Sequence, residues 1–319
     1  MNYEEEPLHI VTPLLRSDAL TKLAPASKGV YLKMENCQPG GSFKIRAFGR
    51  LTQKLKKDGC KSFIVPTTGN TGFAMAHASL LLGMQCIVYV PISTPEECVE
   101  RLKLAGAEVK IIGTYFSDTW EIATEESKKA GITFVYPSGP EIWAEYETMV
   151  HELFAQLPSK PGVIVLSVGD GSLMIGILQG LRKVDSFNLS VKANKPVVLE
   201  KITSVAVCLG ARSIAPNLLD LTRQFNVISE VVTDTEAVES CVRFVDDECS
   251  MVEPGCGAAL AAVYSGLLTK LYNNGKLPQL ASGPAVVIVC GGRCVSTRLL
   301  QSWSNQFNVA YPFPASKST

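Results

Sequence analysis

Short apolar segments alternate with longer amphipathic ones along much of the chain, and this alternation limits the fold more than any other feature. It predicts strands at residues 63–65, 86–90, 108–112 and 133–136, and helices at residues 73–82, 94–104 and 117–130. Apolar strands that alternate with helices are typical of a parallel sheet covered by helices on both faces. Right-handed crossovers then place the strand-to-helix loops at one edge of the sheet, where ligands bind. The sequence therefore predicts an α/β protein with mostly parallel sheets.

A second series of the same kind follows. We predict a buried strand at residues 162–168, a helix at 172–182 and a last clear strand at 285–289. The first of these strands runs into Gly169-Asp170-Gly171, and the last ends at Cys290-Gly291-Gly292. No stretch between the two series has the composition of a linker, so the pattern alone does not divide the chain into domains.

The charge balance and the cysteine spacing narrow the class of protein. Thirty basic and thirty acidic residues cancel, which argues against a nucleic-acid or anionic-membrane partner. The segment 1–6 is acidic and unlike a signal peptide, and no apolar run is long enough to span a bilayer. Ten scattered cysteines without a C-x-x-C pair indicate reduced thiols, and His9, His77 and His151 form no metal-ligand pattern. We expect a cytoplasmic protein without a metal site.

The stretch Pro39-Gly40-Gly41-Ser42-Phe43-Lys44-Ile45-Arg46 stands between a predicted strand at 30–34 and a predicted helix at 45–57. Lys44 would lie at the helix N-terminus, with Ser42 as the N-cap. A helix N-terminus carries partial positive charge and disfavours a cation. A Schiff base between the lysine amine and a carbonyl would remove that conflict. An ordinary exposed lysine on a turn is the alternative interpretation.

The segment from Ser42 to Arg46, preceded by Pro-x-Gly, resembles the pyridoxal-phosphate lysine motif of the serine/threonine dehydratases. The resemblance extends nearly end to end, through residues 8–14, 252–260 and 287–292. That family belongs to the tryptophan-synthase-β-like, fold-type-II pyridoxal enzymes. The resemblance implies two lobes with the active site between them: a large domain of residues 1–47 and 140–319, and a small domain of residues 48–139. It also implies a homodimer.

The glycine loop at residues 169–173 corresponds to the loop that holds the cofactor phosphate in that family. Backbone N–H groups at a helix N-terminus suit an anion, although a simple tight turn is the alternative. The resemblance assigns cofactor binding to the five residues Gly169, Asp170, Gly171, Ser172 and Leu173. Asp170 departs from the family, which has glycine there, and its carboxylate would repel a phosphate if it pointed inward.

The loop Thr67-Thr68-Gly69-Asn70-Thr71-Gly72 also lies at a strand-to-helix junction. Asn70 matches the asparagine that contacts the oxygen of the cofactor ring. Thr67, Thr68, Gly69 and Asn70 match the loop that holds the α-carboxylate of the substrate, and Thr67 is also a catalytic candidate. Helix capping by Thr68 or Asn70 is an alternative role that is compatible with the first.

Two further residues acquire roles from the resemblance. Cys290 matches the cysteine that faces the pyridine nitrogen, where a neutral thiol favours elimination over transamination. Phe43 is expected to lie against the cofactor ring. On their own, Cys290 would be an ordinary buried thiol and Phe43 a core residue.

The implied activity is the pyridoxal-phosphate-dependent dehydration of L-serine, with L-threonine as a further candidate substrate, to a 2-oxo acid and ammonia, with Lys44 as the cofactor lysine and general base. Three departures from the family motivate a second hypothesis, a homologue with weak or no cofactor binding: Asp170, Pro137 and a missing strand between Val184 and Ser204. A third hypothesis is a β-replacement enzyme of the cysteine-synthase type, because the Thr-Gly-Asn-Thr-Gly loop is close to the form found there. Cys208 is a lesser departure, since the family has alanine at this position.

Overall fold

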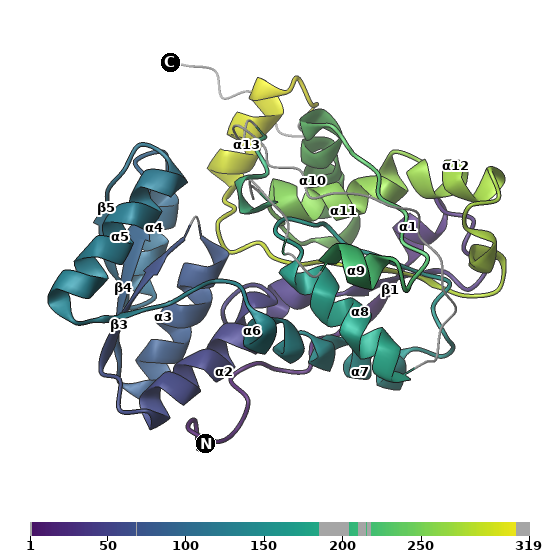
Figure 1. The fold of residues 1–319 in the computed structure, drawn as a ribbon. Helices are drawn as coiled ribbons and strands as arrows, with labels where there is room; N and C mark the ends of the chain where they lie inside the picture. Colours follow the sequence, from purple (N-terminus) through teal and green to yellow (C-terminus); the bar gives the residue numbers. More distant parts are fainter. Residues whose placement is uncertain (1, 68, 185–203, 210–214, 216–217, 311–319) are drawn as a thin grey trace, which may run out of the picture.

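The computed structural model describes residues 2–67, 69–184, 204–209, 215 and 218–310, and its core is two four-stranded sheets (Figure 1). The first sheet has the order β1 (Leu14–Ser17), β2 (Val30–Lys33), β8 (Ala285–Ile288) and β7 (Val163–Val165). The second has the order β5 (Glu108–Ile111), β4 (Gln85–Val90), β3 (Ser62–Pro66) and β6 (Thr133–Phe134). Among the described strands β1 pairs antiparallel with β2, and every other pair is parallel. The α/β class with mostly parallel sheets is confirmed.

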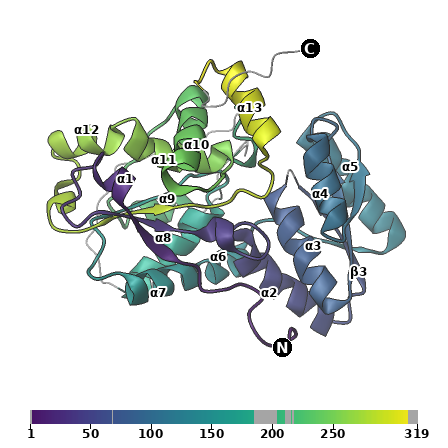
Figure 2. The same cartoon turned by 180° about the vertical axis from the view of Figure 1, so that it is seen from behind.

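The second sheet is covered on both faces, as its apolar strands require. Ile64 and Ile87 share one face with Tyr89 and pack with Ala123 of α5 (Phe116–Ala130). Alternate residues such as Val65 point to the other face and join the main core, which includes α3 (Asn70–Leu82) and α4 (Glu96–Leu104). In both views this sheet and its helices lie to one side of the rest of the molecule (Figures 1 and 2).

The first sheet is surrounded by the remaining helices (Figure 2). Its central strand β8 is wholly buried, and all four of its residues are 0% exposed. The α-helices on this side of the molecule, apart from α2, are α1 (Asp18–Thr21), α6 (Pro140–Glu145), α7 (Glu147–Gln156), α8 (Ser172–Val184), α9 (Leu218–Thr222), α10 (Asp234–Glu248), α11 (Pro254–Tyr264), α12 (Leu267–Asn273) and α13 (Thr297–Gln306). Short 3-10 turns lie at η1 (Glu35–Cys37), η2 (Val207–Leu209) and η3 (Pro278–Ala281).

Helix α2 (Lys44–Lys57) connects the two halves of the molecule. It leaves the first sheet after β2 and packs against α3 on one side and α6 on the other. Ile45 and Phe48, both 0% exposed, form part of its buried face. The start of α2 therefore lies where the two sheets approach each other.

The strands and helices that the sequence predicted are present, but several of their ends differ. Helix α3 begins at Asn70, three residues before the predicted start, and β7 is shorter than the strand predicted at 162–168. The N-cap prediction for α2 is wrong. Phe43 occupies the cap position without a side-chain bond, and the buried Ser42 hydroxyl has no partner. Ser42 instead forms an isolated antiparallel bridge with Gly291, and this bridge fixes the chain direction into the helix.

Within the described residues, the structure contains no helix that combines the length and the apolar character needed to cross a membrane. The predicted loss of a strand between Val184 and Ser204 falls on residues 185–203, which lie outside the described residues.

Candidate active site

A cavity of about 110 Å³ lies at the ends of β3, β7 and β8, where α2, α3 and α8 begin. Strand-to-helix loops from both sheets contribute to its wall. The wall consists of Phe43, Lys44, Thr67, Asn70, Thr71, Ser167, Val168, Gly169, Asp170, Gly171, Leu173, Met174, Cys208, Leu209, Glu253 and Cys290. Residues far apart in sequence thus meet at one site, as expected for the carboxyl ends of parallel strands.

Lys44 is the first residue of α2, and its side chain is half-buried in the cavity wall. Its Nζ lies 5.2 Å from the ring centroid of Phe43 and 5.6 Å from that of Phe48. The amine has no hydrogen-bond or ion-pair partner within the described part of the chain. A primary amine at a helix N-terminus, beside aromatic rings and free of a carboxylate partner, is placed to react with a carbonyl.

A hydrogen bond inside the loop before α3 stabilises the conformation of that loop. Gly69 has a φ of 152°, and its N–H donates to the Thr67 hydroxyl at 3.1 Å. Thr67 is 6% exposed, so its hydroxyl is oriented by the loop itself. The loop brings Thr67 and Asn70 to the cavity wall, whereas Gly69 lies behind it. Thr68 lies outside the described residues.

Asn70 is tied to Glu253, a residue that the sequence analysis did not assign to the site. The Asn70 Nδ2 donates to Glu253 Oε1 at 2.5 Å, while the buried Oδ1 of Asn70 has no partner. Burial raises the pKa of the Glu253 carboxyl, and the hydrogen bonds from Asn70 and Cys208 only partly oppose this effect. Glu253 lies at the N-cap of α11, a helix rich in small residues. Its position directly before this helix was the sequence signal that could have assigned Glu253 to the site.

The glycine loop opens α8 as predicted, but Asp170 points back into it. The Asp170 carboxylate accepts a hydrogen bond from the Ser172 N–H at 3.1 Å and one from the Ser172 hydroxyl at 2.5 Å. Gly171 has a φ of +92°, and a Cβ there would collide with Leu218. Ser172 is 1% exposed and does not reach the cavity wall, since its hydroxyl also contacts Ser138 and Trp143.

Three sulfur and hydroxyl groups line the wall beside the end of β8. Cys290 is 5% exposed, and its Sγ lies 3.6 Å from the Ser167 hydroxyl. The Cys290 carbonyl accepts from the Phe43 N–H at 3.1 Å, so strand β8 also holds the residue before Lys44. Cys208 lies in η2 and also lines the cavity, while part of the residue is exposed to solvent. Both thiols therefore face the cavity.

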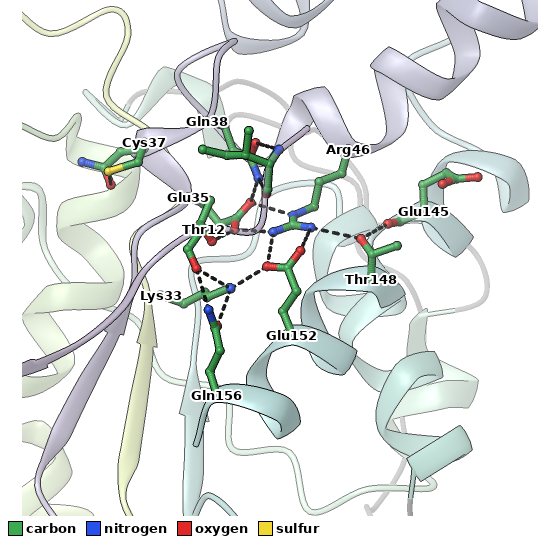
Figure 3. Close-up of polar contacts among 12 residues, drawn as sticks. Thr12, Lys33, Glu35, Cys37, Gln38, Arg46, Glu145, Thr148, Glu152 and Gln156 are labelled. Atoms are coloured by element: carbon green, nitrogen blue, oxygen red, sulfur yellow. Dashed lines mark hydrogen bonds and ion pairs between the residues drawn. The ribbon is translucent and has the colours of Figure 1, made fainter. Parts of the chain in front are cut away.

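Beneath the start of α2 lies a buried ionic cluster, drawn in Figure 3. Arg46, two residues after Lys44, donates to both oxygens of Glu35 and to both oxygens of Glu152, at distances from 2.6 to 2.8 Å. Lys33 Nζ contacts Glu152 at 2.5 Å and the Thr12 carbonyl at 3.0 Å. The side chains of Lys33, Glu35 and Arg46 are 0% exposed. The cluster joins β2, η1, α2 and α7, and thereby fixes the first turn of the helix that carries Lys44.

Most of the predicted residues therefore meet at one cavity. Phe43, Lys44, Thr67, Asn70, Gly169, Asp170, Gly171, Leu173 and Cys290 line it. Ser172 and Gly69 adjoin it without lining it, and Thr68 is not described. The described residues contain no group of three or more His, Cys, Asp or Glu side chains arranged to hold a metal ion.

The residues present fit pyridoxal phosphate. The cavity offers one unpartnered amine for an aldehyde and one unpartnered buried amide oxygen, that of Asn70, for a ring hydroxyl. It also offers a glycine loop at the N-terminus of a thirteen-residue helix for a phosphate. The Asp170 carboxylate opposes this fit, because it takes up donors of Ser172.

A family model described as "Pyridoxal-phosphate dependent enzyme" matches residues 6–291. The chain therefore belongs to the pyridoxal-phosphate-dependent enzymes of this family, whose fold-type-II architecture agrees with the two sheets and the cavity between them.

Curated relatives and solved structures agree with this assignment. The chain is 42% identical to the mouse (Mus musculus) protein named L-serine dehydratase/L-threonine deaminase, over 96% of this chain and 98% of that one. It is also 42% identical to the human (Homo sapiens) protein named serine dehydratase-like, over 94% of this chain and 95% of that one. A fungal L-serine ammonia-lyase from Rhizomucor miehei superimposes with a TM-score of 0.84 at 28% identity, covering 95% of this chain and 100% of that chain.

Proposed function

We propose that this protein dehydrates L-serine, and also L-threonine, to the 2-oxo acid and ammonia. The observation that carries the proposal is the cavity in which the unpartnered Lys44 amine, the Asn70 amide and the glycine loop at residues 169–171 meet. The L-serine dehydratases among its relatives and the fungal L-serine ammonia-lyase support the same reaction class.

The predicted residues of the cavity divide into two groups by their roles in this reaction. Pyridoxal phosphate, when bound, draws electrons away from the α-carbon of the amino acid and so makes its α-proton acidic. The Lys44 Nζ holds the cofactor at rest, and as a free amine it takes the α-proton. The loop at residues 67–70 binds the α-carboxylate, and the hydrogen bond from the Gly69 N–H to the Thr67 hydroxyl holds that loop.

The remaining groups orient the cofactor. Asn70 presents its side-chain amide to the ring oxygen, and Glu253 fixes the orientation of that amide. Cys290 presents a thiol to the ring nitrogen, and Phe43 packs against the ring. Gly169 and Gly171 leave space for the phosphate, and the N-terminus of α8, which includes Leu173, provides N–H donors. Ser172 does not line the cavity, but its hydrogen bonds to Asp170 stabilise this loop.

The test is to purify the protein and to measure both its visible absorbance with pyridoxal phosphate and its formation of pyruvate from L-serine. The proposal expects the wild type to show both signals and Lys44→Ala to lose both while it keeps a cooperative thermal transition. A Lys44→Ala variant that retains both signals would refute the proposal. A thioether product from activated serine and a thiol would instead indicate the β-replacement reaction.

A second candidate, a homologue that binds the cofactor weakly, is favoured by one observation. The Asp170 carboxylate already accepts the bonds that the Ser172 N–H and hydroxyl would offer to a phosphate. Absence of the visible cofactor absorbance at millimolar pyridoxal phosphate, together with a cooperative melt, would favour this candidate over the first.

We also propose the domain division at residues 48–139 against 1–47 and 140–319, supported by the second sheet lying entirely within the middle segment. We propose a homodimer in the cytoplasm that acts in amino-acid metabolism, where its pyruvate is available to gluconeogenesis. Light scattering tests the dimer, and fractionation of cells tests the location.

A further inference from the structure

Two thiols meet between the second-sheet side of the molecule and the end of the first sheet. Cys98 lies in the first turn of α4, and Cys294 follows β8 by six residues. Their Sγ atoms are 3.2 Å apart, although the residues are 196 positions apart in the sequence. All ten cysteines are free thiols in the structure.

Arg101 anchors the segment that carries Cys294 to the helix that carries Cys98. Its Nη1 donates to the Arg293 carbonyl at 2.7 Å and to the Val295 carbonyl at 2.6 Å. The backbone on both sides of Cys294 is therefore bound to α4. The two sulfur atoms are held at contact distance by hydrogen bonds outside the pair, and not by their own interaction alone.

The surroundings act differently on the two thiols. The hydrogen bond to Cys294 lowers the pKa of the Cys98 thiol and the Arg101 charge acts in the same direction, while burial and the Glu253 charge oppose them. The hydrogen bond to Cys98 and burial raise the pKa of the Cys294 thiol well above its ordinary value. A thiolate is the nucleophile in thiol oxidation and exchange. Cys294 is partly exposed, so a small oxidant reaches the pair from solvent.

We propose that Cys98 and Cys294 are a reversible oxidation site that closes to a disulfide between the two halves of the molecule. A peroxide oxidises one thiol to a sulfenic acid and releases water. The second thiol then attacks that sulfur, the S–S bond forms, and a second water leaves. The two thiols lose two electrons in total, and these reduce the peroxide. The sulfur atoms need to approach by about 1.1 Å to reach an S–S bond of about 2.05 Å.

Closure acts directly on the candidate active site, and this part of the proposal rests on the proposed function. A Cβ on Gly69 would lie 2.8 Å from the Cys294 Sγ and 4.0 Å from the Cys98 Sγ, so the pair lies against the loop before Asn70. Cys294 is also four residues after Cys290. A disulfide would fix the substrate loop relative to the end of β8, and we expect turnover to fall severalfold until a thiol reductant opens the bond.

The test is to treat the pyridoxal-phosphate-loaded protein with a small excess of hydrogen peroxide, to block free thiols, and to map peptides without reduction. We expect a cross-linked peptide pair that contains Cys98 and Cys294, and its loss after dithiothreitol. Cys294→Ser should abolish the cross-link. Cys249→Ser, at an exposed thiol on the C-cap of α10, should leave it unchanged.

Other outcomes would overturn the proposal. These are sulfinic acid at either position without a cross-link, or a disulfide that joins other cysteines while Cys98 and Cys294 stay reduced. If Cys294→Ser does not fold, Cys98→Ala gives the same comparison. Peptide mapping does not depend on catalysis, so a protein that forms the disulfide but makes no pyruvate even when its thiols are reduced supports the oxidation site and refutes the proposed function.

Discussion

The carboxylate of Asp170 accepts hydrogen bonds from both the backbone N–H and the hydroxyl of Ser172, at 3.1 and 2.5 Å. These two donors stand at the first residue of α8, where an anion would otherwise find partial positive charge and free N–H groups. An acidic side chain of the protein thus occupies part of the site that the fold provides for a phosphate.

Asp170→Gly should therefore strengthen the binding of pyridoxal phosphate. Removal of the carboxylate frees the Ser172 donors and removes a negative charge beside a dianion. We expect the dissociation constant to fall about tenfold, equivalent to about 1.4 kcal/mol. A titration of visible absorbance measures this constant.

Two controls separate the effect of removing the Asp170 charge from the effect of losing its hydrogen bonds to Ser172. Asp170→Asn removes the charge but keeps an acceptor for Ser172, so its affinity should lie between those of Asp170→Gly and the wild type. Pyridoxal without its phosphate should bind the wild type and the glycine variant about equally. Unchanged or weaker binding of the phosphate form by Asp170→Gly would contradict this account.

The Arg46 cluster should be the least tolerant polar group in the molecule. Arg46→Met would leave Glu35, whose side chain is 0% exposed, and the nearly buried Glu152 without their shared cation. Loss of one partner from a buried ionic cluster costs about 3–5 kcal/mol, so the free energy of unfolding in urea should fall by that amount. The matched control is Arg50→Met, an exposed arginine on the same helix, which should change stability by less than about 0.5 kcal/mol. Equal effects of the two substitutions would contradict this role.

The same cluster predicts a pH dependence of stability. Burial alone would raise the pKa of Glu152, but hydrogen bonds and charges from Arg46 and Lys33 outweigh it and hold the pKa below its ordinary value. A carboxyl with a lowered folded-state pKa stabilises the fold above its unfolded pKa, about 4.3. This stabilisation is lost as the pH falls through the folded-state value.

Glu152→Gln tests that pH dependence. The difference in unfolding free energy between the wild type and this variant should be constant from about pH 6 to 8 and should shrink below about pH 4.3. A difference that grows as the medium is acidified would contradict the assignment.

The sequence indicated the α/β class and many of the strands and helices because those signals are local and repeated, but it gave no sign of β1 or of the strand order. Buried strands such as β4 and β8 consist almost wholly of apolar residues. Glycine residues mark the ends of the helices next to these strands. Lys44 could be placed at a helix start for the same reason. The N-cap of that helix could not, because a long-range bridge between Ser42 and Gly291 decides the local geometry there.

The rest of the site depends on contacts that no local pattern encodes. Glu253 reaches Asn70 across 183 positions, and Arg46 reaches Glu152 across 106. Each of these residues looks like an ordinary surface charge in the sequence. The direction of the Asp170 side chain, which the sequence left open, follows from the fit of its carboxylate to the two donors of Ser172.

The most direct test of the whole account is the covalent attachment of the cofactor. The protein is incubated with pyridoxal phosphate, reduced with borohydride, digested and mapped by mass spectrometry, with the exposed Lys54 of the same helix as the internal comparison. The account predicts a pyridoxyl group on Lys44 and none on Lys54. A Lys44 peptide that stays unmodified while the protein is folded and saturated with cofactor would contradict it.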